Sequence, residues 1–308
     1  WDADLCTQCG KCPFVCPHSA IRSKVYHKSE LDRAPVGFKS APMRAKGFPD
    51  GYHISYQVAP EDCTGCTLCV DICPIRDKSK VSRKALNMSA QPPLREAEVA
   101  NWEFFSQLPE FDRSELKLNT IPASMVLQPL FEFSGACVGC GETPYIKLAS
   151  QLFGDRMIVA NATGCSSIYG GNLPTTPWTT TAGGRGTAWS NSLFEDNAEF
   201  GLGMRLAVDK QTEMARSLLS GLSGYLDADL VAALLEADQS TEAGIHEQRE
   251  RVQRLDHALS KSKQPQASRL LSLSEYLCRV SVWIMGGDGW AYDIGFGGLD
   301  HVLATGAN

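Results

Sequence analysis

Two short runs of apolar residues in the second half of the chain predict buried β-strands. The first is DRMIVANATG (residues 155–164), which ends in a turn, and the second is RVSVWIMGGDGW (279–290), where β-branched and aromatic residues precede glycines. Between them, residues 191–222 and 229–260 space their apolar residues as amphipathic helices do, and the second stretch is rich in good helix formers. This alternation predicts an α/β domain over residues 131–308.

The rest of the chain has other patterns. Residues 1–90 hold most of the cysteines, and residues 91–130 are interrupted by prolines, which predicts a connector that lies across a surface. Within the α/β region, TTPWTTTAGGRGTAWSNS (175–192) is polar and glycine-rich and predicts a long loop. Long loops inside compact domains are often functional.

Composition and charge limit the class of protein. The chain has 308 residues, enough for about two domains, and its 43% hydrophobic and 21% charged residues are typical of a soluble globular protein. A net charge of -6 gives no basic surface for nucleic acid. We see neither an apolar run of the ~20 residues that a membrane span needs nor a signal peptide, so the cytoplasm is expected. The chain starts at Trp1 rather than methionine, so a preceding segment is expected.

Twelve cysteines are too few and too clustered for a secreted disulfide scaffold of this length. One four-cysteine pattern occurs twice, as CTQCGKCPFVCP (6–17) and CTGCTLCVDICP (63–74), each with the CxxCxxCxxxCP spacing of bacterial two-cluster ferredoxins. In that arrangement three thiolates of one loop bind one cubane, and the fourth cysteine ligates the other cluster. The spacing therefore predicts one [4Fe–4S] cluster on Cys6, Cys9, Cys12 and Cys73, and a second on Cys63, Cys66, Cys69 and Cys16.

Alternatives to this assignment are weaker. Structural zinc also uses CxxC pairs, but it rarely uses this spacing, and disulfides are disfavoured in a reducing compartment. Residues 21–62, between the two runs, form an insertion with many Lys and Arg residues, which serve either to dock an acidic electron partner or, more simply, as a solvated face. His18, next to Pro17, is a candidate for hydrogen bonding to a cluster, although a partly exposed side chain is the simpler expectation.

A third set of cysteines lies in the α/β region. GACVGCGETPY (135–145) supplies Cys137 and Cys140, and NATGCSS (161–167) supplies Cys165 at the end of a predicted strand. Three cysteines suggest a third cluster that lacks one ligand. Cys278 could be that ligand on count alone, but it lies in a strand pattern, where a free cysteine is usually a small buried apolar residue.

The segment GGDGWAYDIG (286–295) follows the second predicted strand. Gly287 and Gly289 allow the backbone to turn sharply and to approach a bulky anion, and Asp288 offers a hard oxygen ligand to Mg²⁺ that neutralises a diphosphate. A helix starting near Ala291 would add its N-terminal dipole. The residues predict a Mg²⁺–diphosphate site at this turn.

Taken in order, these motifs resemble the pyruvate:ferredoxin (flavodoxin) oxidoreductase family. The resemblance rests on the double cysteine run, GACVGCGETPY, NATGCSSIYGG (161–171) and GGDGWAYDIGFGGLDHVL (286–303), and it spans the whole chain. It implies an internal fragment of the long single-chain form. The implied fold class is α+β and α/β: a ferredoxin-type two-cluster domain over 1–90, a connector over 91–130, and a thiamine diphosphate-binding α/β domain over 131–308 that is incomplete at its C-terminus.

The resemblance also implies a reaction. The family oxidatively decarboxylates pyruvate with coenzyme A to acetyl-CoA and CO₂, and electrons pass through three [4Fe–4S] clusters to ferredoxin or flavodoxin in a homodimeric protein, with no nucleic acid or membrane partner. It implies Cys137, Cys140 and Cys165 as ligands of the cluster nearest thiamine diphosphate. It further implies cofactor contacts from Glu142, Cys165, Gly287, Asp288, Gly289 and Trp290, with Asp288 on Mg²⁺.

The chain departs from the family pattern at its end. The family's fourth cysteine for the cluster nearest thiamine, and an Asn-containing segment that completes the Mg²⁺ site, both fall beyond residue 308, and Asn308 is not assigned to that role. The fragment is therefore expected to be inactive alone. Two alternatives stay open: an electron-carrier module without chemistry of its own, and an oxidoreductase for another 2-oxoacid.

Overall fold

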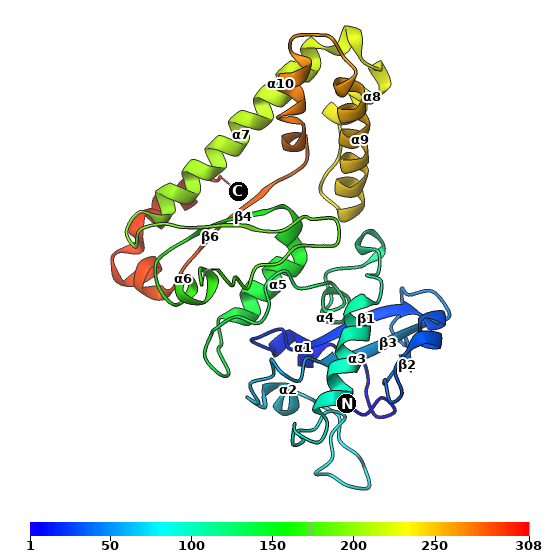
Figure 1. The fold of residues 1–308 in the computed structure, drawn as a ribbon. Helices are drawn as coiled ribbons and strands as arrows, with labels where there is room; N and C mark the ends of the chain where they lie inside the picture. Colours follow the sequence, from blue (N-terminus) through cyan, green and yellow to red (C-terminus); the bar gives the residue numbers. More distant parts are fainter. Residues whose placement is uncertain (173, 308) are drawn as a thin grey trace. The chain divides into compact units, whose positions relative to one another are not determined.

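A computed structural model of the protein describes residues 1–172 and 174–307, so Asn308 lies outside the described residues. The chain forms two compact units (Figure 1). Unit 1 comprises Trp1–Asp112, Leu116–Asp155 and Ile168–Thr187, and unit 2 comprises Arg113–Glu115, Arg156–Ser167 and the residues from Ala188 onward. Within the described ranges, no helix combines the length and the apolar character needed to cross a bilayer.

Unit 1 contains an antiparallel sheet between its two cysteine runs. The strands are β1 (Ile21–His27), β3 (Tyr52–Val58) and β2 (Ala41–Pro42), in the order β1-β3-β2. The β1–β3 register runs from Ile21 opposite Val58 to His27 opposite Tyr52. The predicted insertion between the runs is thus a folded sheet. The 3₁₀ turn η1 (Lys28–Arg33) follows β1.

The segment predicted as a connector contains the helix α3 (Arg95–Gln107), which lies beside the sheet (Figure 1). Phe104, Phe105 and the following Leu108 are buried in one apolar cluster with Tyr26 of β1. Three buried aromatic rings stabilise this contact through the apolar area that they remove from water. The segment therefore contributes to the core of unit 1.

The cysteine runs and the third cysteine pair lie beside short helices of unit 1. These are α1 (Lys11–Val15) in the first run, α2 (Leu68–Asp71) in the second, and α4 (Ile121–Ser124) and α5 (Thr143–Phe153) further along the chain. Helix α5 is followed by the turn η3 (Gly154–Arg156), which leads out of unit 1.

Unit 2 is built on a parallel sheet of three strands. Both predicted strands are present, as β4 (Met157–Asn161) and β6 (Ser281–Met285), with β4 in the centre of the order β5-β4-β6. Strand β5 (Ala188–Asn191) lies in the stretch that we predicted as a loop. Its sequence is polar because it is an edge strand with mostly exposed side chains, so its apolar pattern is too weak to predict it.

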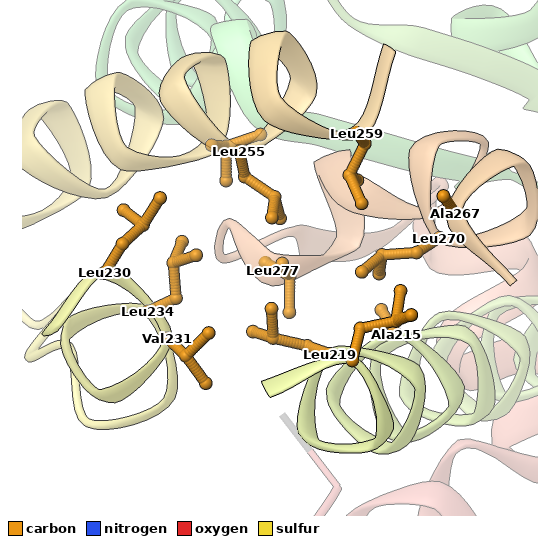
Figure 2. Close-up of a cluster of buried hydrophobic side chains, with 12 residues drawn as sticks. Ala215, Leu219, Leu230, Val231, Leu234, Leu255, Leu259, Ala267, Leu270 and Leu277 are labelled. Carbon is orange, nitrogen blue, oxygen red and sulfur yellow. The ribbon is translucent and has the colours of Figure 1, made fainter. Parts of the chain in front are cut away.

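The helical part of unit 2 includes α7 (Asn197–Gly221), α8 (Ala228–Leu235), α9 (Glu242–Ser260) and α10 (Ala267–Leu271), with the turns η4 (Ser223–Tyr225) and η5 (Ser274–Leu277). Figure 2 shows their leucine-rich contact, in which Leu219, Leu255 and Leu270 are completely buried. The stretch predicted as one helix is two, α8 and α9. The break occurs because Thr241 caps α9 by accepting a hydrogen bond from the N–H of Gly244.

Helix α7 packs closely on the sheet at Gly201. A Cβ atom on Gly201 would lie 2.4 Å from Cγ1 of Ile284 in β6, whereas one on Gly203 would meet nothing within 4 Å. We expect Gly201→Ala to lower the free energy of unfolding by about 1–3 kcal/mol through overpacking. Gly203→Ala should instead raise it by about 0.5–1 kcal/mol, because alanine favours a helix interior over glycine. Denaturant unfolding of both variants tests the pair, and equal effects would contradict this packing.

Candidate functional site

The two cysteine loops share one backbone conformation. Gln8 and Gly65 occupy equivalent positions and have φ of 61° and 71°, and Gly10 and Thr67, also equivalent, have φ of 71° and 68°. Positive φ is uncommon outside glycine, so its occurrence at matched positions is informative. The repeat in the sequence is therefore also a repeat in three dimensions.

Both loops also aim a backbone N–H at the first thiol of their run. The N–H of Gln8 donates to Sγ of Cys6 over 3.3 Å, and the N–H of Gly65 forms the equivalent hydrogen bond to Cys63. Burial is the largest influence on Cys63 and raises its pKa, and the hydrogen bond from Gly65 opposes that rise. Each loop thus offers a hydrogen-bond donor to the first sulfur atom of its run.

Thiols from both runs line each of two neighbouring cavities. All twelve cysteines are free thiols. The larger cavity is lined by the trio of the second run and by Cys16 of the first, and the smaller by the trio of the first run and by Cys73 of the second. A donor set of four thiols around a cavity fits an iron–sulfur cluster. The two sets of lining cysteines are Cys16, Cys63, Cys66 and Cys69, and Cys6, Cys9, Cys12 and Cys73.

The electrostatics within the cavities disfavour free thiolates. Burial, and then repulsion from Cys16, Cys63 and Cys66, raises the pKa of Cys69 to about 11. Burial is also the main cause of the raised pKa of Cys12, followed by repulsion from thiols of both runs. Below these pKa values the thiols stay protonated, so binding of iron must release protons.

His18 differs from its expected exposure, because it is buried with only 4% of its surface exposed. Its Nδ1 lies 3.1 Å from the carbonyl oxygen of Ser134, so this nitrogen carries a proton. Nε2 is buried without a hydrogen-bond partner among the described residues, and the residue lines the larger cavity. The hydrogen bond to Ser134 fixes the imidazole ring at the cavity that the second cysteine run lines.

The turn of the third cysteine pair lies close to the second cysteine run. Cys137 and Cys140 form a tight turn before α5, in which the N–H of Cys140 donates to the carbonyl of Cys137 over 3.0 Å. Between them, Gly139 has a φ of 75°, and a Cβ atom there would lie 3.9 Å from Cβ of Cys66. Glu142 is half-buried at the start of α5. The turn therefore lies close to Cys66, a cysteine of the larger cavity.

The remaining predicted ligand lies in the other unit. Cys165 is exposed and opens α6 (Cys165–Gly170), immediately after β4. The joint use of Cys137, Cys140 and Cys165 thus stays a prediction. Cys278 precedes β6 rather than lying in it, and it packs against the leucine cluster of unit 2 as an apolar residue would.

Two predicted site segments meet at one edge of the parallel sheet. Cys165 follows the end of β4, and Gly287, Asp288 and Gly289 follow the end of its neighbour β6. The carboxyl ends of parallel strands are where α/β sheets bind ligands. Gly287 and Asp288 are exposed, and the space beside Cα of Gly287 is open. The turn fits one half of a Mg²⁺–diphosphate site, with a single carboxylate ligand.

The turn is anchored by Trp290. Its ring is 3% exposed and packs with Ala162 and Ala198, and a Cβ on Gly286 would lie 2.7 Å from it. The helix expected near Ala291 is only a π-helical turn, η6 (Gly289–Asp293). Glycines at 295, 297 and 298 have positive φ and interrupt the helical conformation after this turn. The 3₁₀ turn η7 (Phe296–Gly298) then precedes α11 (Leu299–Thr305). The buried ring of Trp290 thus anchors the turn through its packing.

A polar network that the sequence analysis did not predict lies behind this edge of the sheet. Asn197 is fully buried at the start of α7, and its Nδ2 donates to the carbonyl of Met285 over 3.0 Å. Its Oδ1 accepts from the hydroxyl of Ser192 over 2.8 Å. Asn161 of β4 donates to Asn191 of β5 over 3.0 Å. These bonds hold the three strand ends in register, and only the unusual density of asparagines hints at them.

Comparisons with known proteins agree with this geometry. Residues 5–76 match the family model of the 4Fe-4S dicluster domain. The whole chain is 60% identical to a putative pyruvate-flavodoxin oxidoreductase of Synechocystis sp. and to the pyruvate-flavodoxin oxidoreductase of Trichormus variabilis. The resemblance seen in the sequence is confirmed. The pyruvate:ferredoxin oxidoreductase of Moorella thermoacetica is 47% identical over the whole chain.

These relatives are much longer than the chain. It covers 26% of each of the three proteins, so it spans about a quarter of the length of the curated relatives it matches. The dicluster match covers the two cysteine runs and the sheet between them. Mixed α/β structure with a parallel sheet follows it, as the predicted fold class requires. The boundaries predicted at residues 90 and 130 stay predictions.

Proposed function

We propose that the chain is the electron-transfer and part of the cofactor-binding region of an enzyme that oxidatively decarboxylates pyruvate with coenzyme A to acetyl-CoA and CO₂. The observation that carries this proposal is the sorting of eight thiols into two cavities, each with three from one run and one from the other. Similarity over the whole of this chain to pyruvate-flavodoxin oxidoreductases supports pyruvate as the substrate. The named acceptors of those relatives support flavodoxin or ferredoxin as the electron partner.

Three [4Fe–4S] clusters would be arranged as a path. Cys6, Cys9, Cys12 and Cys73 would hold one, and Cys16, Cys63, Cys66 and Cys69 a second. Cys137, Cys140 and Cys165 would hold a third with a ligand from outside this chain. The closeness of Gly139 to Cys66 supports a path in which electrons from the third cluster enter the larger cavity first. They would then pass to the smaller cavity, since thiols of the two cavities are close enough to repel each other.

Thiamine diphosphate would supply the decarboxylation chemistry at the edge of the parallel sheet. Asp288 would ligate Mg²⁺, Gly287 and Gly289 would let the backbone approach the diphosphate, and Trp290 would hold the turn in place. Cys165 at the same edge, and Glu142 by family resemblance, would contact the cofactor. The protein's part is to bind and orient these groups. A cytoplasmic homodimer stays the prediction for the whole protein.

Viologen reduction by the full-length protein tests the proposed function. We expect pyruvate to drive this reduction only with coenzyme A and thiamine diphosphate present, and iron analysis to give roughly twelve iron atoms per chain for three cubanes. Iron without pyruvate-dependent reduction would favour an electron-carrier module. Reduction driven better by another 2-oxoacid would reassign the substrate, and zinc in place of iron would contradict the cluster assignment.

A further inference from the structure

Two buried lysines bind the same pair of backbone positions in the two halves of the cysteine module. Lys147 of α5 donates to the carbonyls of Pro13 and Phe14, the latter over 2.9 Å. Lys84 donates to the carbonyls of Val70 and Asp71, over 2.6 and 3.2 Å. These acceptors are equivalent, because each pair directly follows the third cysteine of its run. The lysines are not equivalent, since they come from unrelated parts of the chain.

The carbonyls lie at the C-terminal ends of two short helices. Helices α1 and α2 are 5 and 4 residues long, and the carbonyls of Pro13 and Val70 also accept backbone hydrogen bonds from the N–H groups of Cys16 and Cys73. Lys147 has a third acceptor, the carbonyl of Cys16 at 3.2 Å, which uses all three N–H donors of an ammonium. Hydrogen bonding alone would therefore explain a helix cap. It does not explain why the cap is a charged group.

The charge of Lys147 has no protein counter-ion. The side chain is only 2% exposed, and among the described residues no carboxylate forms an ion pair with it. Three carbonyl acceptors require three N–H donors, which the side chain has only as an ammonium. An unpaired buried charge is costly, so a negative group nearby is required. A cluster bound by four thiolates is negative and gains one more negative charge on reduction.

We propose that Lys147 and Lys84 are a matched pair of buried cations that raise the reduction potentials of the two clusters. Lys147 acts chiefly on the cluster of Cys16 and the second run, since it binds the carbonyl of Cys16 itself. Lys84 acts chiefly on the cluster of Cys73 and the first run by the equivalent relation, since the carbonyls of Val70 and Asp71 that it binds precede Cys73 as those of Pro13 and Phe14 precede Cys16. Both are positioning residues, and the inference rests on the proposed cluster sites.

The test is Lys147→Met in the full-length protein, with the midpoint potentials measured by EPR-monitored redox titration. We expect the reduction equilibrium of the Cys16 cluster to become at least about tenfold less favourable, or about 59 mV for a one-electron couple. Lys84→Met should shift the other cluster instead. The signals are assigned by the cluster that each of Cys16→Ala and Cys73→Ala removes. Iron content is measured in every sample.

Lys11→Met is the matched control. Lys11 lies on α1, the helix whose carbonyls Lys147 binds, and it carries the same charge, but it is exposed, so solvent and salt screen it. We expect less than a twofold effect from this change. The Lys147 effect should persist in high salt, whereas any Lys11 effect should disappear.

Lys147→Gln separates charge from hydrogen bonding, because glutamine keeps an N–H donor without the charge. A shift like that of Lys147→Met supports the proposal. A wild-type potential in either neutral variant would overturn it and leave the lysines as helix caps. Loss of iron from both Lys147 variants, in chains that still fold by circular dichroism, would assign Lys147 to cluster assembly instead. Absence of iron from the wild-type protein would defeat the proposed function rather than this inference.

Discussion

Replacing Cys73 with alanine is expected to abolish the cluster of the first cysteine run and to spare that of the second. The reason is that the two runs exchange their fourth cysteines. Cys73, the fourth cysteine of the second run, lines the cavity of Cys6, Cys9 and Cys12, although it lies 57 residues after Cys16, the fourth cysteine of the first run. Cys16→Ala should have the reciprocal effect on the second run. Each variant of the full-length protein should lose roughly four iron atoms per chain and one of the EPR signals.

The pair of variants is more informative than either alone. If each run built its own cluster, Cys73→Ala would remove the cluster of Cys63, Cys66 and Cys69, and the EPR assignments would be inverted. Cys278→Ala is the control, because this thiol packs on an apolar cluster and lines neither cavity. It should keep all of its iron. Iron loss in that variant equal to that of Cys73→Ala would mean that iron content reports folding rather than ligation.

Replacing Asp288 with alanine is expected to abolish Mg²⁺–thiamine diphosphate binding while the cluster spectrum stays intact. Asp288 is the one carboxylate in the exposed GDG turn that follows β6. Loss of an outer-shell partner of a metal typically costs roughly 10–100-fold in affinity, so loss of a direct ligand should cost at least about a hundredfold. Isothermal titration of the full-length protein with thiamine diphosphate, with and without Mg²⁺, measures the effect.

A surface carboxylate supplies the comparison. Asp229 is exposed in the first turn of α8, away from the strand ends, and Asp229→Ala should bind the cofactor as the wild-type protein does. Unchanged binding by Asp288→Ala would remove this residue from the metal site. Loss of iron together with cofactor would indicate a folding defect, which circular dichroism and the Trp290 fluorescence of the anchored turn would reveal.

The carboxyl edge of the parallel sheet depends on residues that sequence patterns do not single out. Asn197 binds the carbonyl of Met285, the residue before the GGDG segment, and Trp290 is clamped between alanines of β4's extension and α7. Neither residue has a spacing that identifies its role. The structural role of Asn197 is set by its hydrogen bonds to two backbone carbonyls and one hydroxyl, which are brought to it by folding.

The sequence by itself determined the features that depend on residues close together in the chain. The spacing of cysteines within each run sets a tight loop, the repeat of that spacing predicts two clusters, and dense apolar runs predict β4 and β6. Such features depend on neighbours a few residues away, and the matched φ values at Gln8 and Gly65 follow from the same short loop. The dicluster match over residues 5–76 agrees with that prediction.

Only the tertiary structure decided the features that join distant segments. Strand β5 is polar and forms because β4 offers it a free edge, and His18 is buried because Ser134, 116 residues away, lies beside it. Lys147 reaches carbonyls more than 130 residues away in sequence, whereas Lys84 reaches the equivalent carbonyls of the second run from only 13 and 14 residues away. A backbone carbonyl carries no sequence signature. The lysine that binds it is therefore visible only once the chain has folded.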